Sequence, residues 1–515
     1  MLNKKTQQII GFILGLGILA IPAHAITIDW NGYFRADNNF IFNYQKDRAT
    51  PGYSNDTTAG GEYIKGEGQK GATYSTLFAK LKPKILVNDN VIIRSEWNLG
   101  DPVAGFFGRG VPRRDQNNSL TTEKDGMNIS IARLWLDTHT DFGTLQVGRA
   151  PMHWGIGAIF NSGDAPFDRF QSTSDTIRLL SKFGYLTLMP LYAKVSMGQS
   201  LAGAITPDTL GTGTVLQGSD DVTDYGLALK YENPEEDLEA GVMYYKRNAS
   251  DGQNTFLYPG AASTYTSGAN GMNLKLFDFY AKKTWRRLEL SGELPIYSGS
   301  VGDINGVGQR NAYKTTALIG EAAINYDTWR HSAKFGTVPG QGPATTGARG
   351  DSFNALYLHR NYKLGQILFR YNLGNFGAAN PDPIAPNTYN ATTVNPYDAA
   401  VTNVKYLMLA TEKKGDQWGF NAGLLFAKAN ESAVIGKDFY NHRTRQWGTA
   451  VASQDKNLGM ELDLGVRYQW DENVSFGADF GILFPGNYFA FINKVNEEGG
   501  TDAVNAISFT AATSF

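Results

Sequence analysis

Cysteine is absent from the 515-residue sequence. Its absence excludes disulfide bonds, thiol catalysis and cysteine-based metal sites together. Long apolar runs are also scarce. Apart from IIGFILGLGILAIP near the start, no apolar run approaches the ~18 residues that a membrane-spanning helix needs. The mature chain is therefore not expected to be a helical membrane protein.

Strong net charge is missing as well. The formal net charge of −2 is too small to predict nucleic acid or another strongly charged partner. The mean hydropathy of −0.31 resembles that of a soluble protein. It still permits a β-barrel, because a barrel places its apolar residues at alternate positions along each strand.

The first 25 residues have the form of a cleaved secretory signal. Lys4 and Lys5 precede the apolar run, and Ala23 and Ala25 place small residues at the −3 and −1 cleavage positions. The run is too short and wrongly flanked for the alternative, a permanent membrane anchor. We expect residues 1–25 to be removed, which leaves a mature chain of residues 26–515. Without disulfides, a closed hydrogen-bonded ladder of strands would stabilise such an exported chain.

Residues 462–484, LDLGVRYQWDENVSFGADFGILF, show strict alternation. The even positions from Leu462 to Phe484 are apolar on both sides of the Asp471–Asn473 turn, whereas the odd positions are polar or glycine. This pattern predicts a β-hairpin with one apolar and one polar face. A soluble sandwich would bury the apolar face, and a membrane barrel would turn it toward lipid.

Connection lengths distinguish these two folds. Short turns are predicted at Asn88–Asn90, Asp141–Gly143, Phe183–Tyr185, Asn233–Asp237, Trp285–Arg287, Asp327–Arg330, Lys363–Gly365, Lys414–Gln417 and Asp471–Asn473. Longer polar segments alternate with them near 46–70, 100–126, 155–174, 197–222, 249–270, 298–312, 339–350, 374–400, 431–455 and 485–503. Such alternation is typical of an outer-membrane barrel with tight periplasmic turns and long extracellular loops.

The sequence therefore predicts an all-β protein, a single transmembrane antiparallel up-and-down β-barrel. Twenty candidate strands are counted, and merging of a pair gives a range of 18–20. The first strand begins close to the predicted cleavage site, so we expect no plug domain within residues 26–515.

The last strand, VNAISFTAATSF, ends on Phe515 in the lipid-facing phase. A final aromatic residue resembles the terminal signal that the outer-membrane assembly machinery reads in Gram-negative bacteria. We accordingly expect this chain in a Gram-negative outer membrane, in contact with lipid and lipopolysaccharide.

Two stretches resemble Gram-negative porins. Residues 131–154, IARLWLDTHTDFGTLQVGRAPMHW, resemble a hairpin region of these proteins, and IDWNGYFRA resembles the opening strand of maltoporin-like sugar porins. The resemblance covers about 35 residues. It implies a passive channel without a cofactor, and it implies a homotrimer, as in other porins. It also implies that Tyr33 and Arg35 line the channel, where an aromatic ring would stack on a sugar.

Strand parity assigns further side chains to the lumen. We expect the following pore-lining residues from the strands: Tyr33, Arg35, Asp37, Lys80, Lys82, Arg94, Glu96, Arg133, Arg178 and Lys182. Basic residues concentrate in the first seven strands and acidic residues in strands nine to twelve. This distribution either creates a transverse field that filters solutes or arises by chance, because every water-filled lumen needs charges.

The loop 155–174 is unusually apolar for an exposed segment. If it folds back into the barrel, it places Asp164, Asp168 and Arg169 at a constriction, as the third external loop does in porins. The alternative is that its apolar residues contact a neighbouring subunit or another loop.

Arg149 conflicts with parity, since it shares the lipid phase with Leu145 and Val147. An arginine near mid-bilayer on the lipid side costs ~2–4 kcal/mol. Either a bulge at Gly148 turns Arg149 inward, or the side chain lies at the rim. We favour the bulge, because glycine within a strand often marks one.

Other chemistry finds little support. GEGQKG at 66–71 matches a dinucleotide motif by letter but lies in a polar loop. The histidines outside the signal are scattered without metal-ligand spacing, so we expect no metal and no cofactor. An enzyme or adhesin is disfavoured, although a serine or aspartate beside His153 or His442 stays open. The expected function is passive diffusion of small hydrophilic solutes, with sugars as one possibility. A dedicated polysaccharide-export or substrate-specific channel is the alternative.

Overall fold

The computed structural model describes residues 27–43, 72–100, 113–114, 122–123, 129–197, 221–249, 272–302, 304–305, 310–371, 399–442, 446–491, 493, 495 and 501–515. The predicted signal 1–25 and the loops 46–70, 197–222, 249–270 and 374–400 fall wholly or mostly outside these residues. Within the described part of the chain, no helix is long and apolar enough to cross a membrane.

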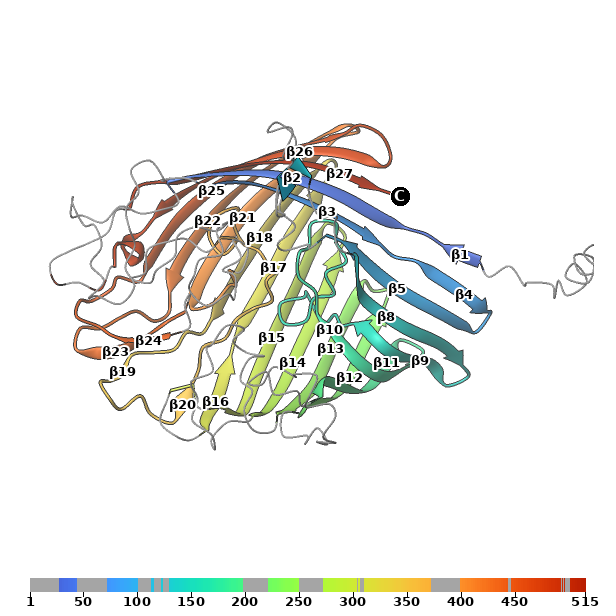
Figure 1. Cartoon of the computed structure of the whole chain (residues 1–515), viewed down its shortest axis with the longest axis horizontal. Coiled ribbons are helices and arrows are strands. Elements are labelled where there is room, and N and C mark those ends of the chain that lie inside the picture. Colours follow the sequence, from blue (N-terminus) through green and yellow to red (C-terminus); the bar gives the residue numbers. More distant parts are fainter. Residues whose placement is uncertain are drawn as a thin grey trace, which may run out of the picture.

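The described strands form one closed barrel (Figure 1). Each strand pairs antiparallel with its neighbours in chain order, and the last strand, β27, pairs with β2 to close the ring. The first half of the barrel consists of β2 (Gly32–Phe42), β3 (Ala72–Leu81), β5 (Val91–Leu99), β8 (Ile129–Thr140), β9 (Gly143–Pro151), β10 (Thr173–Phe183), β11 (Leu186–Met197), β12 (Asp221–Asn233) and β13 (Leu238–Ala249). The second half consists of β14 (Met272–Trp285), β15 (Leu288–Val301), β17 (Leu318–Tyr326), β18 (Trp329–Val338), β21 (Val404–Lys414), β22 (Trp418–Ala429), β25 (Asn457–Gln469), β26 (Val474–Pro485) and β27 (Val504–Ser514).

Three shorter strands occupy the same ring positions as longer strands that adjoin them in the sequence. They are β1 (Thr27–Asp29) beside β4 (Lys84–Asn88), and β16 (Asn311–Thr316), which pairs with β15 as β17 does. The barrel thus has eighteen strand positions, the lower end of the expected range. Smaller elements outside the ring are β6 (Arg113–Arg114), β7 (Thr122–Glu123), β19 (Ala344–Thr345), β20 (Ser352–Phe353), β23 (Lys437–Asn441), β24 (Gln446–Thr449) and the 3-10 helix η1 (Asn487–Ala490).

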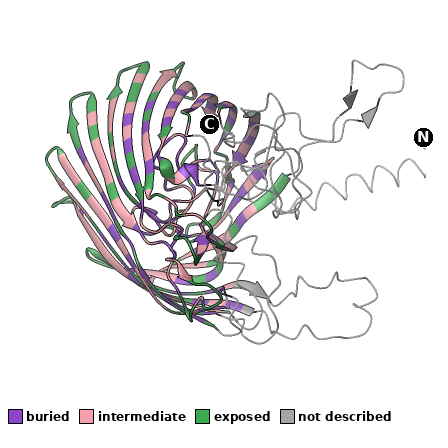
Figure 2. Ribbon diagram, turned by 90° about the vertical axis from the view of Figure 1, so that its left-hand side faces the viewer, coloured by how far each residue is buried: buried purple, intermediate pink, exposed green. Residues whose placement is uncertain are grey.

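The two faces of the barrel wall differ as the alternation predicts. Exposed and buried residues alternate along the strands in Figure 2. In the hairpin of β25 and β26, Leu464 is 46% exposed and Phe476 44% exposed, whereas Asp463 and Asp479 are each 7% exposed. The apolar side chains therefore point out of the barrel, and the polar side chains point into its interior.

Eight of the nine short turns lie where the sequence predicts them, but the hairpin expected at Lys363–Gly365 is wrong. Residues 354–371 form no barrel strand, and Leu364, Ile367 and Leu368 are buried against other residues. Their apolar spacing imitates a strand because they cover the inner wall of the barrel. Removing this hairpin from the twenty candidates leaves the eighteen observed strands.

Candidate functional site: a constriction inside the barrel

The connection between β9 and β10, residues 152–172, crosses the interior; we call it the first inner segment. On one side the carbonyl oxygen of Pro166 accepts a hydrogen bond from Arg35 Nη1 of β2 at 2.7 Å. On the other side the Glu293 carboxylate of β15 accepts the backbone N–H groups of Ile156 and Ile159 at 2.9 and 3.2 Å. The expected inward fold of this loop is therefore present, since one segment touches two distant parts of the wall.

Apolar side chains hold the first inner segment in place. Ile156, Ile159 and Phe170 pack against buried clusters of the inner wall, whereas Phe167 is 43% exposed. Gly155 has φ +58°, and a Cβ there would lie 2.4 Å from Glu293 Oε2. Glycine is therefore required where the segment meets the wall.

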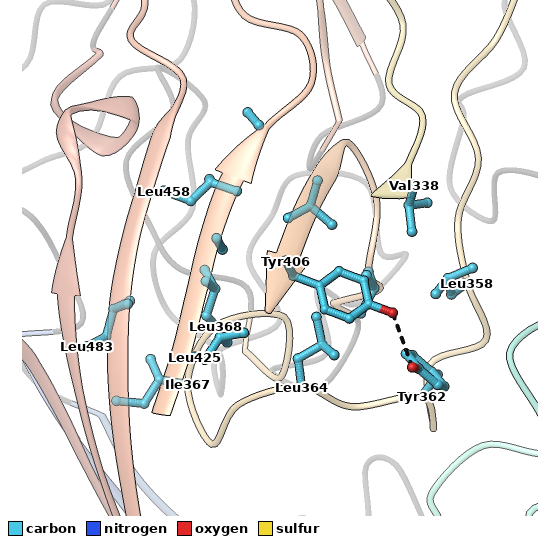
Figure 3. Close-up of a cluster of buried hydrophobic side chains, with 14 of the residues drawn as sticks. Val338, Leu358, Tyr362, Leu364, Ile367, Leu368, Tyr406, Leu425, Leu458 and Leu483 are labelled. Atoms are coloured by element: carbon cyan, nitrogen blue, oxygen red, sulfur yellow. Dashed lines mark hydrogen bonds between the residues drawn. The ribbon is translucent and has the colours of Figure 1, made fainter. Parts of the chain in front are cut away.

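Residues 354–371, the second inner segment, line another part of the interior. Figure 3 shows Tyr362, Leu364, Ile367 and Leu368 facing wall residues such as Leu425. The Tyr362 and Tyr406 hydroxyl groups lie 3.1 Å apart. This segment thus covers an apolar stretch of inner wall that water would otherwise contact.

The two inner segments meet inside the barrel. His359 N donates a hydrogen bond to Ala158 O at 2.7 Å, and Asn361 Nδ2 donates to Phe170 O at 2.6 Å. The Arg360 guanidinium lies 4.8 Å from the centre of the Phe170 ring. The first segment leaves the wall between β9 and β10, and the second leaves it between β18 and β21. Because they still touch, the two segments narrow the interior together.

Charged side chains surround this junction and form what we call the basic network. One part joins β2 to the first inner segment: Asp37 Oδ2 lies 3.0 Å from Arg35 Nε and 2.6 Å from Arg169 Nη2. Thr510 and Thr76 also donate hydrogen bonds to the Asp37 carboxylate, at 2.9 and 3.1 Å. All of these side chains face the interior, and Asp37 is thereby compensated despite its burial.

A second part of the basic network is centred on Arg133, which is 1% exposed. Its Nη1 atom lies 3.1 Å from Glu96 Oε2 and 3.4 Å from Asp164 Oδ1. Lys80 Nζ lies 2.8 Å from Glu96 Oε1, and Lys82 Nζ lies 3.2 Å from Asp164 Oδ1. Arg133 therefore links three wall strands to the first inner segment.

The remaining candidates from the strands lie outside these two parts. Arg94 Nε donates to Asp137 Oδ2 at 2.7 Å, and buried Arg178 donates to Gln146. Lys182 is exposed near the end of β10. The structure thus brings most candidate residues into these two parts, whereas Arg94, Arg178 and Lys182 lie outside them.

Tyr33 faces the interior but is only 4% exposed. Its ring packs edge-on against Phe78, with the ring centroids 5.9 Å apart, and Lys80 Nζ lies 5.8 Å from the ring centre. Neither face of the ring is therefore open to the interior, so the stacking of a sugar on Tyr33 loses its structural basis.

The inward orientation expected for Arg149 is wrong. The register from Leu136↔Val147 to Leu134↔Arg149 runs without a shift, so Gly148 makes no bulge, although its φ is +125°. Arg149 remains on the outer face, two residues before the end of β9, and forms a two-point ion pair with Asp175 at 2.7 and 2.9 Å. The Asp175 carboxylate on the neighbouring strand compensates the charge of Arg149. The alternation along β9 had made such a charge improbable on the outer face.

The two acidic residues of the first inner segment differ in their surroundings. Burial raises the pKa of Asp164, but a hydrogen bond with Ser162 and the charges of Lys82 and Arg133 outweigh it, so the pKa lies below its ordinary value. Burial raises the pKa of Asp168, and the nearby Lys363 charge only partly opposes this effect. Asp164 is therefore the more firmly ionised carboxylate of the segment.

Lys363 was not among the residues singled out by the sequence, yet it faces the basic network. Burial lowers the pKa of Lys363, the charges of Arg370, Arg169 and Arg35 lower it as well, and the carboxylate of Asp168 opposes them, so that the pKa lies at about 7. Since the pKa is lowered, Lys363 is charged below about pH 7 and neutral above it.

For the channel that the sequence predicts, Lys363 implies a pH dependence of ion preference. As the pH rises through about 7, Lys363 loses its charge, so the preference for anions over cations should fall. Reversal potentials under a salt gradient, recorded at several pH values, measure the effect. In Lys363→Arg the charge persists over this range, so its titration should be flat; an equal slope in both proteins would contradict the assignment.

The acidic wall predicted for strands nine to twelve is largely compensated. Glu289 is paired with Arg330 at 3.0 Å, and Glu321 with Lys334 at 3.2 Å. Around the junction, by contrast, cations outnumber carboxylates. The cations are Arg35, Lys80, Lys82, Arg133, Arg169, Arg360, Lys363 and Arg370. The carboxylates are Asp37, Glu96, Asp164 and Asp168, together with Glu293 and Glu461, which accept backbone N–H groups of the inner segments. Excess positive charge therefore collects at the narrow point.

The two histidines left open as catalytic candidates have structural partners. His153 Nδ1 accepts the backbone N–H of Ser162 at 3.3 Å, and His442 Nε2 accepts that of Gln341 at 2.7 Å. Burial lowers the pKa of His442 to about 3, so this ring is neutral. Among the described residues, no three histidine, aspartate or glutamate side chains come together as metal ligands.

Comparison with known proteins yields similar solved structures. No family model matches the sequence, and no curated protein matches it. OccK2 (OpdF) of Pseudomonas aeruginosa is 10% identical, with a TM-score of 0.46 over 95% of this chain and 98% of that chain. OccAB3 of Acinetobacter baumannii is 12% identical, with a TM-score of 0.44 over 95% of this chain and 99% of that chain.

A loop-deletion mutant of OmpT, an outer membrane protein of Vibrio cholerae, is 11% identical. Its TM-score is 0.34 over 95% of this chain and 100% of that chain. Similarity at this level does not carry function or substrate from one protein to another. The resemblance to maltoporin-like sugar porins gains no specific support from these structures.

Proposed function

We propose that this chain is an outer-membrane channel for passive diffusion of small hydrophilic solutes. The observation that carries the proposal is the closed eighteen-strand barrel with apolar residues outside and charged residues inside. The outer face of such a wall suits lipid, and its inner face suits water. In the orientation typical of outer-membrane barrels, the short turns lie on the periplasmic side. Contact with lipopolysaccharide, recognition of Phe515 by the assembly machinery and a homotrimer remain predictions.

The narrow interior favours small solutes over an exported polysaccharide. The two inner segments touch through Ala158 and His359, so a bulky polymer would have to displace one of them. The excess of cations around the junction supports a preference for anions over cations, because fixed charges raise the local concentration of ions of opposite sign. The burial of Tyr33 gives no support to a preference for sugars.

Conductance of the refolded protein in planar lipid bilayers tests this proposal. We expect stepwise currents and a reversal potential on the anion-selective side in a salt gradient. Absence of current from correctly folded protein would contradict the channel. Sugars added during the same recording test the alternative, since a sugar-preferring channel is blocked by its own solute at millimolar concentration.

A further inference from the structure

Two wall carboxylates attach the second inner segment to β25. Glu461 Oε1 accepts the backbone N–H of Ile367 at 2.6 Å, and Glu461 Oε2 accepts that of Leu368 at 2.7 Å. Asp463 Oδ2 accepts the backbone N–H of Gln366 at 3.2 Å. Three consecutive amides thus point at two residues that share one face of the strand. Hydrogen bonds to an ionised acceptor are the stronger kind.

The approach of the segment to the wall is unusually close. Glu461 is 0% exposed, and a Cβ on Gly365 would lie 2.5 Å from Glu461 Oε2. On the neighbouring strand, a Cβ on Gly481 would lie 3.0 Å from Asp463 Oδ1 and 3.1 Å from Gln366 Cβ. Glycine at both positions lets the backbone and the carboxylates meet, so the attachment is a built feature of the wall.

Glu461 and Asp463 stand two residues apart on the inner face of β25, and both carboxyl groups are buried. Two buried carboxyl groups that share a site do not both ionise readily, so we place one proton on the pair. Asp463 Oδ1 is buried and has no donor among the described residues. With the proton on Asp463, Glu461 keeps the single negative charge that faces the amides.

This attachment lies between Lys363 and Arg370, two of the three cationic side chains of the segment. Lys363 precedes the attached residues and faces Asp168, Arg169 and Arg35, and Arg370 follows them and acts on Asp37. Leu364, Ile367 and Leu368 pack on the wall (Figure 3), but apolar packing is non-directional. The directional hydrogen bonds to Glu461 therefore fix where the two cations lie.

We propose that Glu461 is a positioning residue: it holds the second inner segment so that Lys363 and Arg370 stand at the constriction and set its ion preference. This role rests on the proposed channel function. The first inner segment is attached in the same manner by Glu293, whose carboxylate accepts the backbone N–H groups of Ile156 and Ile159. Each inner segment thus has one place where a wall glutamate accepts several of its backbone N–H groups.

Thiol labelling tests the position of the segment without requiring a current. The natural chain has no cysteine, so Leu364→Cys supplies a single thiol at a buried site of the full chain. In Glu461→Gln an amide NH₂ replaces an acceptor oxygen opposite backbone N–H groups. We expect a water-soluble maleimide to label this double variant at least about tenfold faster than Leu364→Cys alone, since one charge-assisted hydrogen bond corresponds to that factor.

Asp463→Asn is the matched control, because its amide is neutral, as the protonated Asp463 is. Labelling in this background should stay within about twofold of the Leu364→Cys parent. Equal labelling in the glutamine and asparagine backgrounds would overturn the proposal. If Glu461→Gln does not fold, Glu461→Asp keeps the charge but shortens the reach, and it should also label faster than Asp463→Asn.

Ion preference separates positioning from simple electrostatics. Removing a negative charge by Glu461→Gln would by itself increase anion preference, whereas displacement of Lys363 and Arg370 decreases it. We expect a shift of the reversal potential toward cations, and a shift toward anions would overturn positioning. If labelling behaves as expected but no variant conducts, the proposed channel function fails and the attachment stands. If the natural protein conducts and labelling is unchanged, only the positioning role fails.

Discussion

Replacement of Arg133 by methionine is expected to lower the free energy of unfolding by about 3–5 kcal/mol. The guanidinium is 1% exposed and is shared between Glu96 and Asp164, with further hydrogen bonds to Thr173 at 3.0 Å and to Ser172 at 3.3 Å. Removing the cation leaves Glu96 buried beside a single partner, Lys80. Urea unfolding of the protein in lipid vesicles, followed by tryptophan fluorescence, measures the change.

Arg133→Lys serves as the matched control for this prediction. Lysine keeps the charge but lacks the planar fork that reaches several acceptors at once. Its free energy of unfolding should therefore lie between those of Arg133→Met and the natural protein. If Arg133→Met were as stable as the natural protein, the basic network would not stabilise the barrel.

At about pH 6, where Lys363 is charged, neutralising two cations at the constriction is expected to lower the ratio of chloride to potassium permeability by roughly thirtyfold, since each charge contributes on the order of 1 kcal/mol. The variant is Lys82→Gln combined with Lys363→Gln. The Lys82 side chain is 29% exposed and pairs with Asp164 of the first inner segment, whereas Lys363 lies near Asp168 of the same segment. Reversal potentials in a potassium chloride gradient give the ratio.

Lys414→Gln is a suitable control for that measurement. The Lys414 side chain is 72% exposed at the end of β21, far from the constriction along the strand. Its removal changes the net charge in the same direction, but the permeability ratio should stay within about twofold, because screening weakens distant surface charges. An equal effect of both variants would show that overall charge, and not the constriction, sets ion preference.

Local pattern sufficed for most of the barrel. Leu464, Asp463 and their neighbours alternate because one face of each strand meets apolar surroundings and the other meets polar groups. The same reasoning located Arg35, Asp37 and Lys80 on the inner face. The apolar content of the first inner segment likewise indicated that it folds inward with Asp164 and Arg169.

Pattern alone failed where one apolar surface imitates another. Leu364 and Ile367 cover the inner wall, but their spacing also fits a strand that faces lipid, so a hairpin was predicted at Lys363–Gly365. Lys363 and Arg370 were consequently missed as constriction residues. The predicted orientation of Arg149 is wrong for a related reason, because its compensating partner Asp175 lies on the next strand of the barrel, β10.

The sequence by itself determined that this chain forms a barrel, which face of each strand points inward and that basic residues collect in the first strands. These properties depend on residues two positions apart, and such neighbours are fixed by the geometry of a single strand. Only the tertiary structure decided what narrows the interior. Glu293 meets an amide 137 residues away and Glu461 an amide 94 residues away, and closure of the ring alone brings such groups together.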